Sequence, residues 1–299
     1  RHSAVVIDVD DPTFTVAASV DVGHDIWDIA PDDGGAWFLT RDAVLEDAVV
    51  RRMAAPVDGT IAARTALTLT EVARTPAHAA WTTPGLELDR RLVRVGDVLV
   101  VTDGDGGGMH VRDDRTGPPL WAGRLERLGA CDFLVVAAEM PWCVQPEGLV
   151  PVASPDGTPI GAWPRDTIPD HRIASGAVAA AAGDIVVHLA GEPATLRTFR
   201  FVPPQGMAAI GSLDVGQVYD LALAGGFASL PRGESGLQPL VKDELVIVDI
   251  RRPEAPSIVG IVAMPVADVI GMAVGDGYLF LSDYNANIVA FSLDDPIRP

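Results

Sequence analysis

The chain has 299 residues, of which 48% are hydrophobic, so it is long enough to bury a large core and too apolar to be disordered. Its 41 acidic and 22 basic residues give a net charge of −19, which argues against the binding of nucleic acid. No apolar run approaches the roughly 18 residues that a membrane-spanning helix needs. The composition predicts an acidic globular protein without a membrane span.

One strand–turn–strand unit recurs near both ends of the chain. Residues 244–253 read ELVIVDIRRP and are followed by the alternating segment 257–263, SIVGIVA. Residues 4–12, AVVIDVDDP, precede the similar segment 14–20, FTVAASV, and residues 287–296, NIVAFSLDDP, repeat the first half. Each copy is a β-branched run followed by a charged turn that ends in proline. This pattern is typical of antiparallel strands.

A second unit lies between these copies and consists of an apolar strand, a Gly/Asp turn and another apolar strand. It is clearest in residues 268–283 and recurs in residues 25–40 and 91–102. No segment shows the apolar spacing of an amphipathic helix, and the 30 glycines and 24 prolines suit many tight turns. The sequence therefore predicts an all-β repeat protein built from four-stranded antiparallel sheets.

The order of these units resembles the LVIVD-repeat family of β-propellers, whose signature is spelled by Leu245-Val-Ile-Val-Asp249. The resemblance covers residues 4–40 and 244–296, and the copies between them are degenerate. It implies that residues 1–299 form a single β-propeller domain. It implies no reaction, because propellers of this kind host many functions.

Counting the innermost strand of each expected four-stranded blade predicts six blades. Successive innermost strands start about 40–55 residues apart in the sequence. The expected starts of these strands are Asp25, Ala79, Phe133, Arg172, Val218 and Val269. Arg91 is the alternative to Ala79 as the first residue of the second of these strands. We expect the strand near Phe14 to complete the last blade and close the ring, with seven blades as the alternative.

Aligning the starts of these six strands brings polar residues to one position, which we expect at the mouth of a central channel. The residues of this position are His24, His78, Asp132, His171, Gln217 and Asp268. Imidazoles converging from several strands suit Zn, Fe or Cu, and a carboxylate from Asp132 or Asp268 could complete the site. Polar residues at a solvated channel mouth also need no ligand, so both interpretations stay open.

Three aromatic residues near this position, Trp27, Trp81 and Tyr219, together with Gln217, are the candidates for contacting an apolar or ring-shaped ligand. The loops expected at residues 45–60, 85–90 and 232–243 could present a further binding face. No nucleophile elbow, phosphate-binding loop or zinc-protease motif occurs.

The only cysteines, Cys131 and Cys143, flank one expected hairpin, so either a disulfide or two buried thiols fits the sequence. The family resemblance favours an exported protein, periplasmic or extracellular.

Two principal functions fit these observations. The first is a binding or interaction module that presents a loop-rich face or channel mouth to a protein or small molecule. The second is an enzyme that uses a transition metal held by His24, His78 and His171 on a hydrophobic small molecule. A third hypothesis is a lactonase-like hydrolase with an oxygen-ligated cation. In that case only Asp132, Gln217 and Asp268 could supply the ligands.

Overall fold

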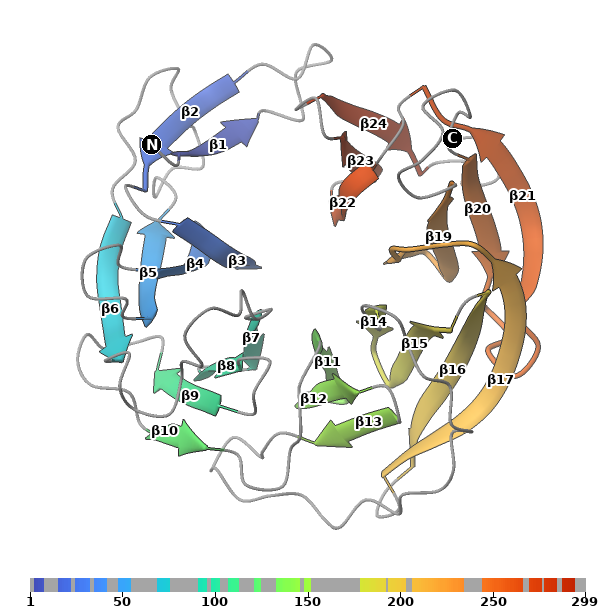
Figure 1. Cartoon of the computed structure of the whole chain (residues 1–299), viewed down its shortest axis with the longest axis horizontal. Helices are drawn as coiled ribbons and strands as arrows, with labels where there is room; N and C mark the ends of the chain where they lie inside the picture. Colours follow the sequence, from blue (N-terminus) through green and yellow to red (C-terminus); the bar gives the residue numbers. More distant parts are fainter. Residues whose placement is uncertain are drawn as a thin grey trace. The chain divides into compact units, whose positions relative to one another are not determined.

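A computed structural model describes the strands of the chain and several of the turns between them (Figure 1). The described residues are 3–7, 16–22, 25–32, 35–41, 48–54, 69–75, 91–95, 98–102, 107–112, 121–124, 133–145, 148–151, 178–191, 193–202, 206–233, 244–265, 269–275, 277–283 and 287–293. They form 24 β-strands, and they include no helix that could cross a membrane.

The chain divides into two compact units, and the first comprises Arg1–Val136 and Val152–Thr158. Three antiparallel sheets of this unit have the strand orders β1-β2, β3-β4-β5-β6 and β10-β9-β8-β7. Their strands are β1 (Ser3–Ile7), β2 (Val16–Asp21), β3 (Asp25–Asp32), β4 (Gly35–Arg41), β5 (Ala48–Ala54), β6 (Leu69–Thr75), β7 (Arg91–Val95), β8 (Val98–Thr102), β9 (Gly107–Arg112) and β10 (Trp121–Arg124).

The second unit comprises Ala137–Pro151 and Pro159–Pro299. Its sheets have the orders β14-β15-β16-β17, β18-β19-β20-β21 and β22-β23-β24. Their strands are β14 (Val178–Ala182), β15 (Ile185–Ala190), β16 (Ala194–Val202), β17 (Gly206–Gly216), β18 (Ala222–Ala224), β19 (Phe227–Arg232), β20 (Glu244–Asp249), β21 (Ser257–Ala263), β22 (Val269–Gly275), β23 (Tyr278–Asp283) and β24 (Ile288–Ser292). One further sheet has the order β11-β12-β13, with β11 (Phe133–Ala137), β12 (Met140–Gln145) and β13 (Gly148–Pro151).

The antiparallel four-stranded repeat predicted from the sequence is confirmed by four of these sheets. In the sheet β10-β9-β8-β7 the first described strand begins at Arg91, the competing start, and Ala79 lies outside the described residues. Residues 48–54, which we expected inside a loop, form β5, because the apolar Val49 and Val50 are fully buried. The described β1 and β2 pair with each other, and closure of a ring by the strand near Phe14, the blade number and the single domain stay predictions.

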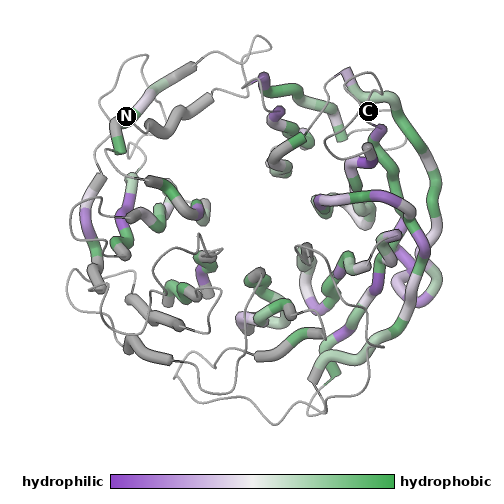
Figure 2. The backbone as a smooth tube through the Cα atoms, viewed as in Figure 1, coloured by the Kyte–Doolittle hydropathy of each residue, from purple (hydrophilic) through white to green (hydrophobic). Residues whose placement is uncertain are grey.

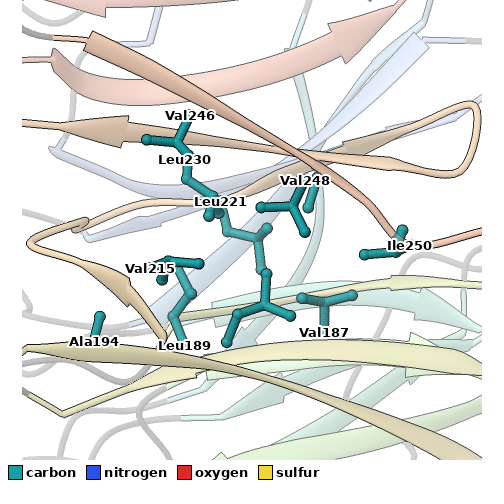
Figure 3. Packing of buried hydrophobic residues seen from close by; sticks show 11 residues of the cluster. Val187, Leu189, Ala194, Val215, Leu221, Leu230, Val246, Val248 and Ile250 are labelled. Carbon is teal, nitrogen blue, oxygen red and sulfur yellow. The ribbon is translucent and has the colours of Figure 1, made fainter. Parts of the chain in front are cut away.

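Strand β20 shows why the run Leu245–Val248 is apolar at every position. Val246 and Val248 pack into a cluster with β15 and β19, whereas Leu245 and Ile247 pack into a second cluster with β22 and β23. A strand that is buried on both faces needs an unbroken apolar run instead of an alternating one. Figure 3 shows the first cluster, in which Val187 and Leu189 of β15 face residues of the neighbouring sheet.

The turn from β20 to β21 is organised by Asp249, the last residue of the LVIVD segment. Its carboxylate accepts hydrogen bonds from the backbone N–H of Arg251 and from the guanidinium of the same residue, and this contact lowers the pKa of Asp249. The turn also joins two sheets, because the buried Thr198 of β16 donates its hydroxyl hydrogen to the Pro253 carbonyl. Arg200 and Glu254 form an ion pair at 3.0 Å beside this contact.

Candidate functional site

Most of the residues that the sequence singles out lie outside the described part of the chain. This is true of the five candidate metal ligands, His24, His78, Asp132, His171 and Asp268, and of Trp81. No group of three or more His, Cys, Asp or Glu side chains suited to a metal occurs among the residues that are described. The metal centre therefore stays a prediction.

Tyr219 and Gln217 are described and differ in their surroundings. Tyr219 is half-buried and packs against the cluster that contains Leu245 and Ile247, so it contributes to the packing between two sheets. Its backbone N–H donates to the Pro231 carbonyl at 3.4 Å. Gln217 is exposed directly after β17 and is free to meet a ligand from solvent.

The backbone pairing within hairpins shows which positions are equivalent in the first strands of three sheets. It is a more direct guide than a count from the first residue of each strand. The backbone pairs Ile26 with Thr40, Val218 with Arg232 and Val269 with Asp283 occupy equivalent positions. They are equivalent because Thr40, Arg232 and Asp283 each lie five residues after the first residue of their strand, which is β4, β19 or β23.

A β-bulge follows the first and the last of these pairs. Trp27 is the extra residue between Ile26 and Asp28, and the residue after Val269 is the extra one in β22. In the sheet β18-β19-β20-β21, Val218 pairs with Arg232 and Ala222 pairs with Ser229. Between these two pairs, the segment before β18 therefore has one residue more than β19. Bulges bend a strand and redirect its side chains, and they recur beside binding sites.

This register places Ile26 of β3, and not the first residue Asp25, level with Val218 and Val269. Counted back from the paired residues, Gln217 is level with Asp25, and His24 lies outside the described residues. Trp27 and Tyr219 directly follow equivalent paired residues in their sheets. The shared polar position of the six strand starts stays a prediction.

The described carboxylates of this region are used within the protein. Asp28 accepts the backbone N–H of Leu92 at 2.7 Å, which joins β3 to the start of β7. The buried Asp283 accepts two hydrogen bonds from Asn287, one from its backbone N–H and one from its side-chain amide, both at 2.8 Å. Both residues hold the fold together, and this explains their polar character inside apolar strands.

A polar pair with a buried histidine, which the sequence did not predict, lies in the sheet β14-β15-β16-β17. His188 of β15 is fully buried directly opposite Arg197 of β16. Both ring nitrogens of His188 and Nη1 of Arg197 are buried without a hydrogen-bond partner. Burial, and to a smaller extent the charge of Arg197, lowers the pKa of His188 to about 4, so the ring is neutral at neutral pH.

The same face of this sheet meets aromatic residues. The ring of His188 lies edge-on to Phe199 at a centroid distance of 6.2 Å, and Phe201 lies edge-on to Trp142 of β12 at 5.7 Å. A neutral imidazole suits such surroundings better than a charged one, because burying a charge without a partner is costly. No sequence signal marks His188, because its segment VVHLA is typical of an ordinary buried strand.

Strand β21 presents the most distinctive surface of the second unit. It is the last strand of its sheet, and it pairs with β20 alone among the described strands. Ile258 is 41% exposed and Ile261 is 49% exposed, and no residue of the strand carries a charge. Figure 2 shows hydrophobic colour along most of this strand. Natural edge strands are usually protected by charged residues or proline, and β21 has neither.

A bulge on β21 aligns the two exposed isoleucines. Ile258 pairs with Val248 and Ile261 with Val246, so Val259 is the extra residue. Residues three apart on a regular strand point to opposite faces, and the bulge brings Ile258 and Ile261 to the same face. The strand thus combines an unpaired backbone edge with an apolar pair of side chains.

Cys143 is buried in β12 and forms a disulfide bond, and Cys131 is the only other cysteine of the sequence. This decides between the two states that the sequence left open. A stable structural disulfide is typical of oxidising compartments.

No protein-family model matches the chain, and no curated protein matches it. Three solved structures illustrate what its fold resembles. The Dos1 propeller has a TM-score of 0.54 at 11% identity, with 90% of this chain and 68% of that chain covered. Sqt1 of Chaetomium thermophilum, solved bound to the N-terminus of ribosomal protein L10, has a TM-score of 0.57 at 12% identity, with 97% and 77% covered. A putative 6-phosphogluconolactonase of Bacteroides fragilis has a TM-score of 0.60 at 11% identity, with 91% and 81% covered.

These similarities confirm the predicted β-propeller fold. At such low identity they establish the fold alone. A protein solved with a bound peptide segment and a protein described as a lactonase share this fold, so function must be argued from the residues of the chain itself. The LVIVD-repeat resemblance stays a prediction.

Proposed function

We propose that the protein is an interaction module that uses its propeller as a rigid scaffold to bind another protein. The observation that carries this proposal is the exposed apolar edge strand β21, with Ile258 and Ile261 on one face. Exposed apolar side chains that gather on a surface often mark a place where another molecule binds. The likeness to Sqt1, which was solved with a bound protein segment, supports the proposal by analogy of fold.

The scaffold beneath this surface is well suited to binding without rearrangement. Residues Leu245–Val248 of β20, which pair with β21, are buried between two apolar clusters, and the turn that joins the two strands is fixed by Asp249 and Thr198. A surface on rigid elements loses little conformational entropy when a partner binds. The disulfide at Cys143 favours a partner in an oxidising compartment, in line with an exported protein.

Site-specific photo-crosslinking in the cells that make the protein tests this proposal. A photoreactive amino acid is placed separately at four exposed aliphatic positions, Val202, Ile261, Val274 and Ile288, and at the exposed polar Thr70 of β6 as a control. We expect one discrete protein adduct from at least one aliphatic position and none from the control. The absence of a protein adduct at all four positions would contradict an interaction module.

A further inference from the structure

We infer that β21 accepts an extended, apolar segment of another protein as an added β-strand, and that basic residues flank this segment in its sequence. The inference rests on the proposed function and adds the mode of binding and the chemistry of the partner. Strand addition uses main-chain hydrogen bonds for affinity and the alternate side chains for specificity.

The edge of β21 supplies the first requirement, which is a row of main-chain groups without a neighbouring strand. The residues Gly260–Ala263 pair regularly with β20 on one side, and no described strand pairs with the other side. The strand contains no proline and no charged residue. An added strand could therefore approach without meeting the features that normally protect an edge.

The side chains supply the second requirement. Ile258 and Ile261 share one face and are exposed, whereas Val259 and Val262 pack on the opposite face against the cluster that contains Leu245. An added strand would place alternate residues over the exposed isoleucines. Apolar residues at these positions gain burial, and a charged residue there would lose hydration without finding a partner.

The charge of the protein favours basic residues on both sides of the bound segment. It also argues against a second copy of the chain as the partner. Near the ends of β21, Arg232 pairs with Glu244, Arg200 with Glu254 and Arg251 with Asp249, so these ion pairs add no net charge. The exposed Arg252 adds one positive charge there. The chain as a whole carries a net charge of −19. Two copies would therefore repel each other as they approach, whereas basic flanks would be attracted to the acidic protein.

A random library of 12-residue peptides displayed on phage is the probe. Selection on the full chain is expected to enrich peptides with alternating apolar residues and terminal Arg or Lys. Their affinity is measured by fluorescence anisotropy. We expect Ile261→Lys to weaken binding about tenfold or more, and Ile288→Lys, which changes an equally exposed isoleucine on β24, to leave it within about twofold. Methylation of alternate backbone nitrogens of the peptide should abolish binding, because it removes main-chain donors and keeps the side chains.

Several outcomes would overturn strand addition. These are failure to enrich any peptide, enrichment of acidic peptides, binding that survives backbone methylation, and equal effects of Ile261→Lys and Ile288→Lys. A dimer of the wild-type chain that Ile261→Lys disrupts, seen by sedimentation, would show that the occupant is a second copy. In each case a crosslinked partner at Val202, Val274 or Ile288 would still support the proposed interaction module, so the two failures are distinguishable.

Discussion

His188 of β15 lies directly opposite Arg197 of β16, and both residues carry buried nitrogen atoms without a hydrogen-bond partner. The pairing is tolerated because His188 is neutral at neutral pH, since burial and the nearby guanidinium lower its pKa to about 4. A proton on His188 would place two positive charges side by side inside the protein. The pair therefore makes this sheet sensitive to acid.

The first prediction concerns this acid sensitivity. The folded-state pKa of His188 lies below its ordinary value of 6.5, so the folded protein binds this proton less readily than the unfolded chain does. Stability is fully present above pH 6.5 and is lost as the pH falls toward 4, by about 3 kcal/mol. Urea unfolding of wild type and His188→Leu between pH 7 and pH 4 measures this difference. Equal pH dependence in the two proteins would exclude the explanation.

The second prediction concerns the contact between β16 and the turn after β20. Thr198→Val removes the hydroxyl that donates to the Pro253 carbonyl and keeps the shape of the side chain. We expect a loss of about 1–3 kcal/mol, because a buried carbonyl is left without its donor. Thr198→Ser retains the hydroxyl and serves as the matched control. Chemical denaturation measures both, and a neutral Thr198→Val would show that the hydrogen bond does not stabilise the fold.

The third prediction concerns the close approach of β17 to the same turn. A Cβ on Gly211 would lie far inside van der Waals contact with the Pro253 carbonyl oxygen, so Gly211→Ala should destabilise the protein by more than 1 kcal/mol. Gly275 of β22 offers the control, since nothing lies within 4 Å of the position of its Cβ. We expect Gly275→Ala to leave the melting temperature nearly unchanged. Equal melting temperatures of the two variants would contradict the described packing.

The fourth prediction concerns the disulfide at Cys143. Thiol titration of the unfolded, unreduced protein should detect no free thiol, and reduction should release two. Closing a loop of this size stabilises a fold by about 3 kcal/mol, so Cys143→Ser should lower the unfolding midpoint under oxidising conditions. Two free thiols in the purified, unreduced protein would contradict the bond.

The histidine metal centre also has a direct test. Elemental mass spectrometry of the purified protein, compared with His78→Ala, measures whether a transition metal is present and whether this residue holds it. Near-stoichiometric Zn, Fe or Cu that the variant loses would establish the centre and favour an enzyme. Trace metal in both proteins would remove the centre and leave the interaction module.

The sequence predicted best those strands whose physical demands are written in a short run of residues. The run Leu245–Val248 is apolar throughout because β20 is buried on both faces. In the structure, Gly225 and Gly226 form a tight turn in which both residues adopt positive φ. Type I′ turns need this conformation at both central positions. The turn at Ala138 and Glu139 has the same conformation without glycine, and it lies within the hairpin that was expected between Cys131 and Cys143.

The polar position was less predictable, because register depends on backbone pairing that composition does not reveal. The pairing places Ile26 of β3, and not its first residue Asp25, level with Val218 and Val269, and a count from the first residue of a strand cannot detect this offset. The exposure of Ile258 and Ile261 could not be predicted from the sequence, because it too depends on strand pairing. Their segment alternates like any half-buried strand, and only its place at the end of the sheet exposes it.

Amide hydrogen exchange of the full chain with and without an enriched peptide tests the central claim most directly. Strand addition predicts slower exchange of amides in Ser257–Ala263 when the peptide is bound, because unpaired N–H groups of the edge become hydrogen-bonded. The neighbouring strand β20, which is already paired on both sides, should change little. Protection confined to another part of the chain, or binding without any protection of β21, would contradict the account.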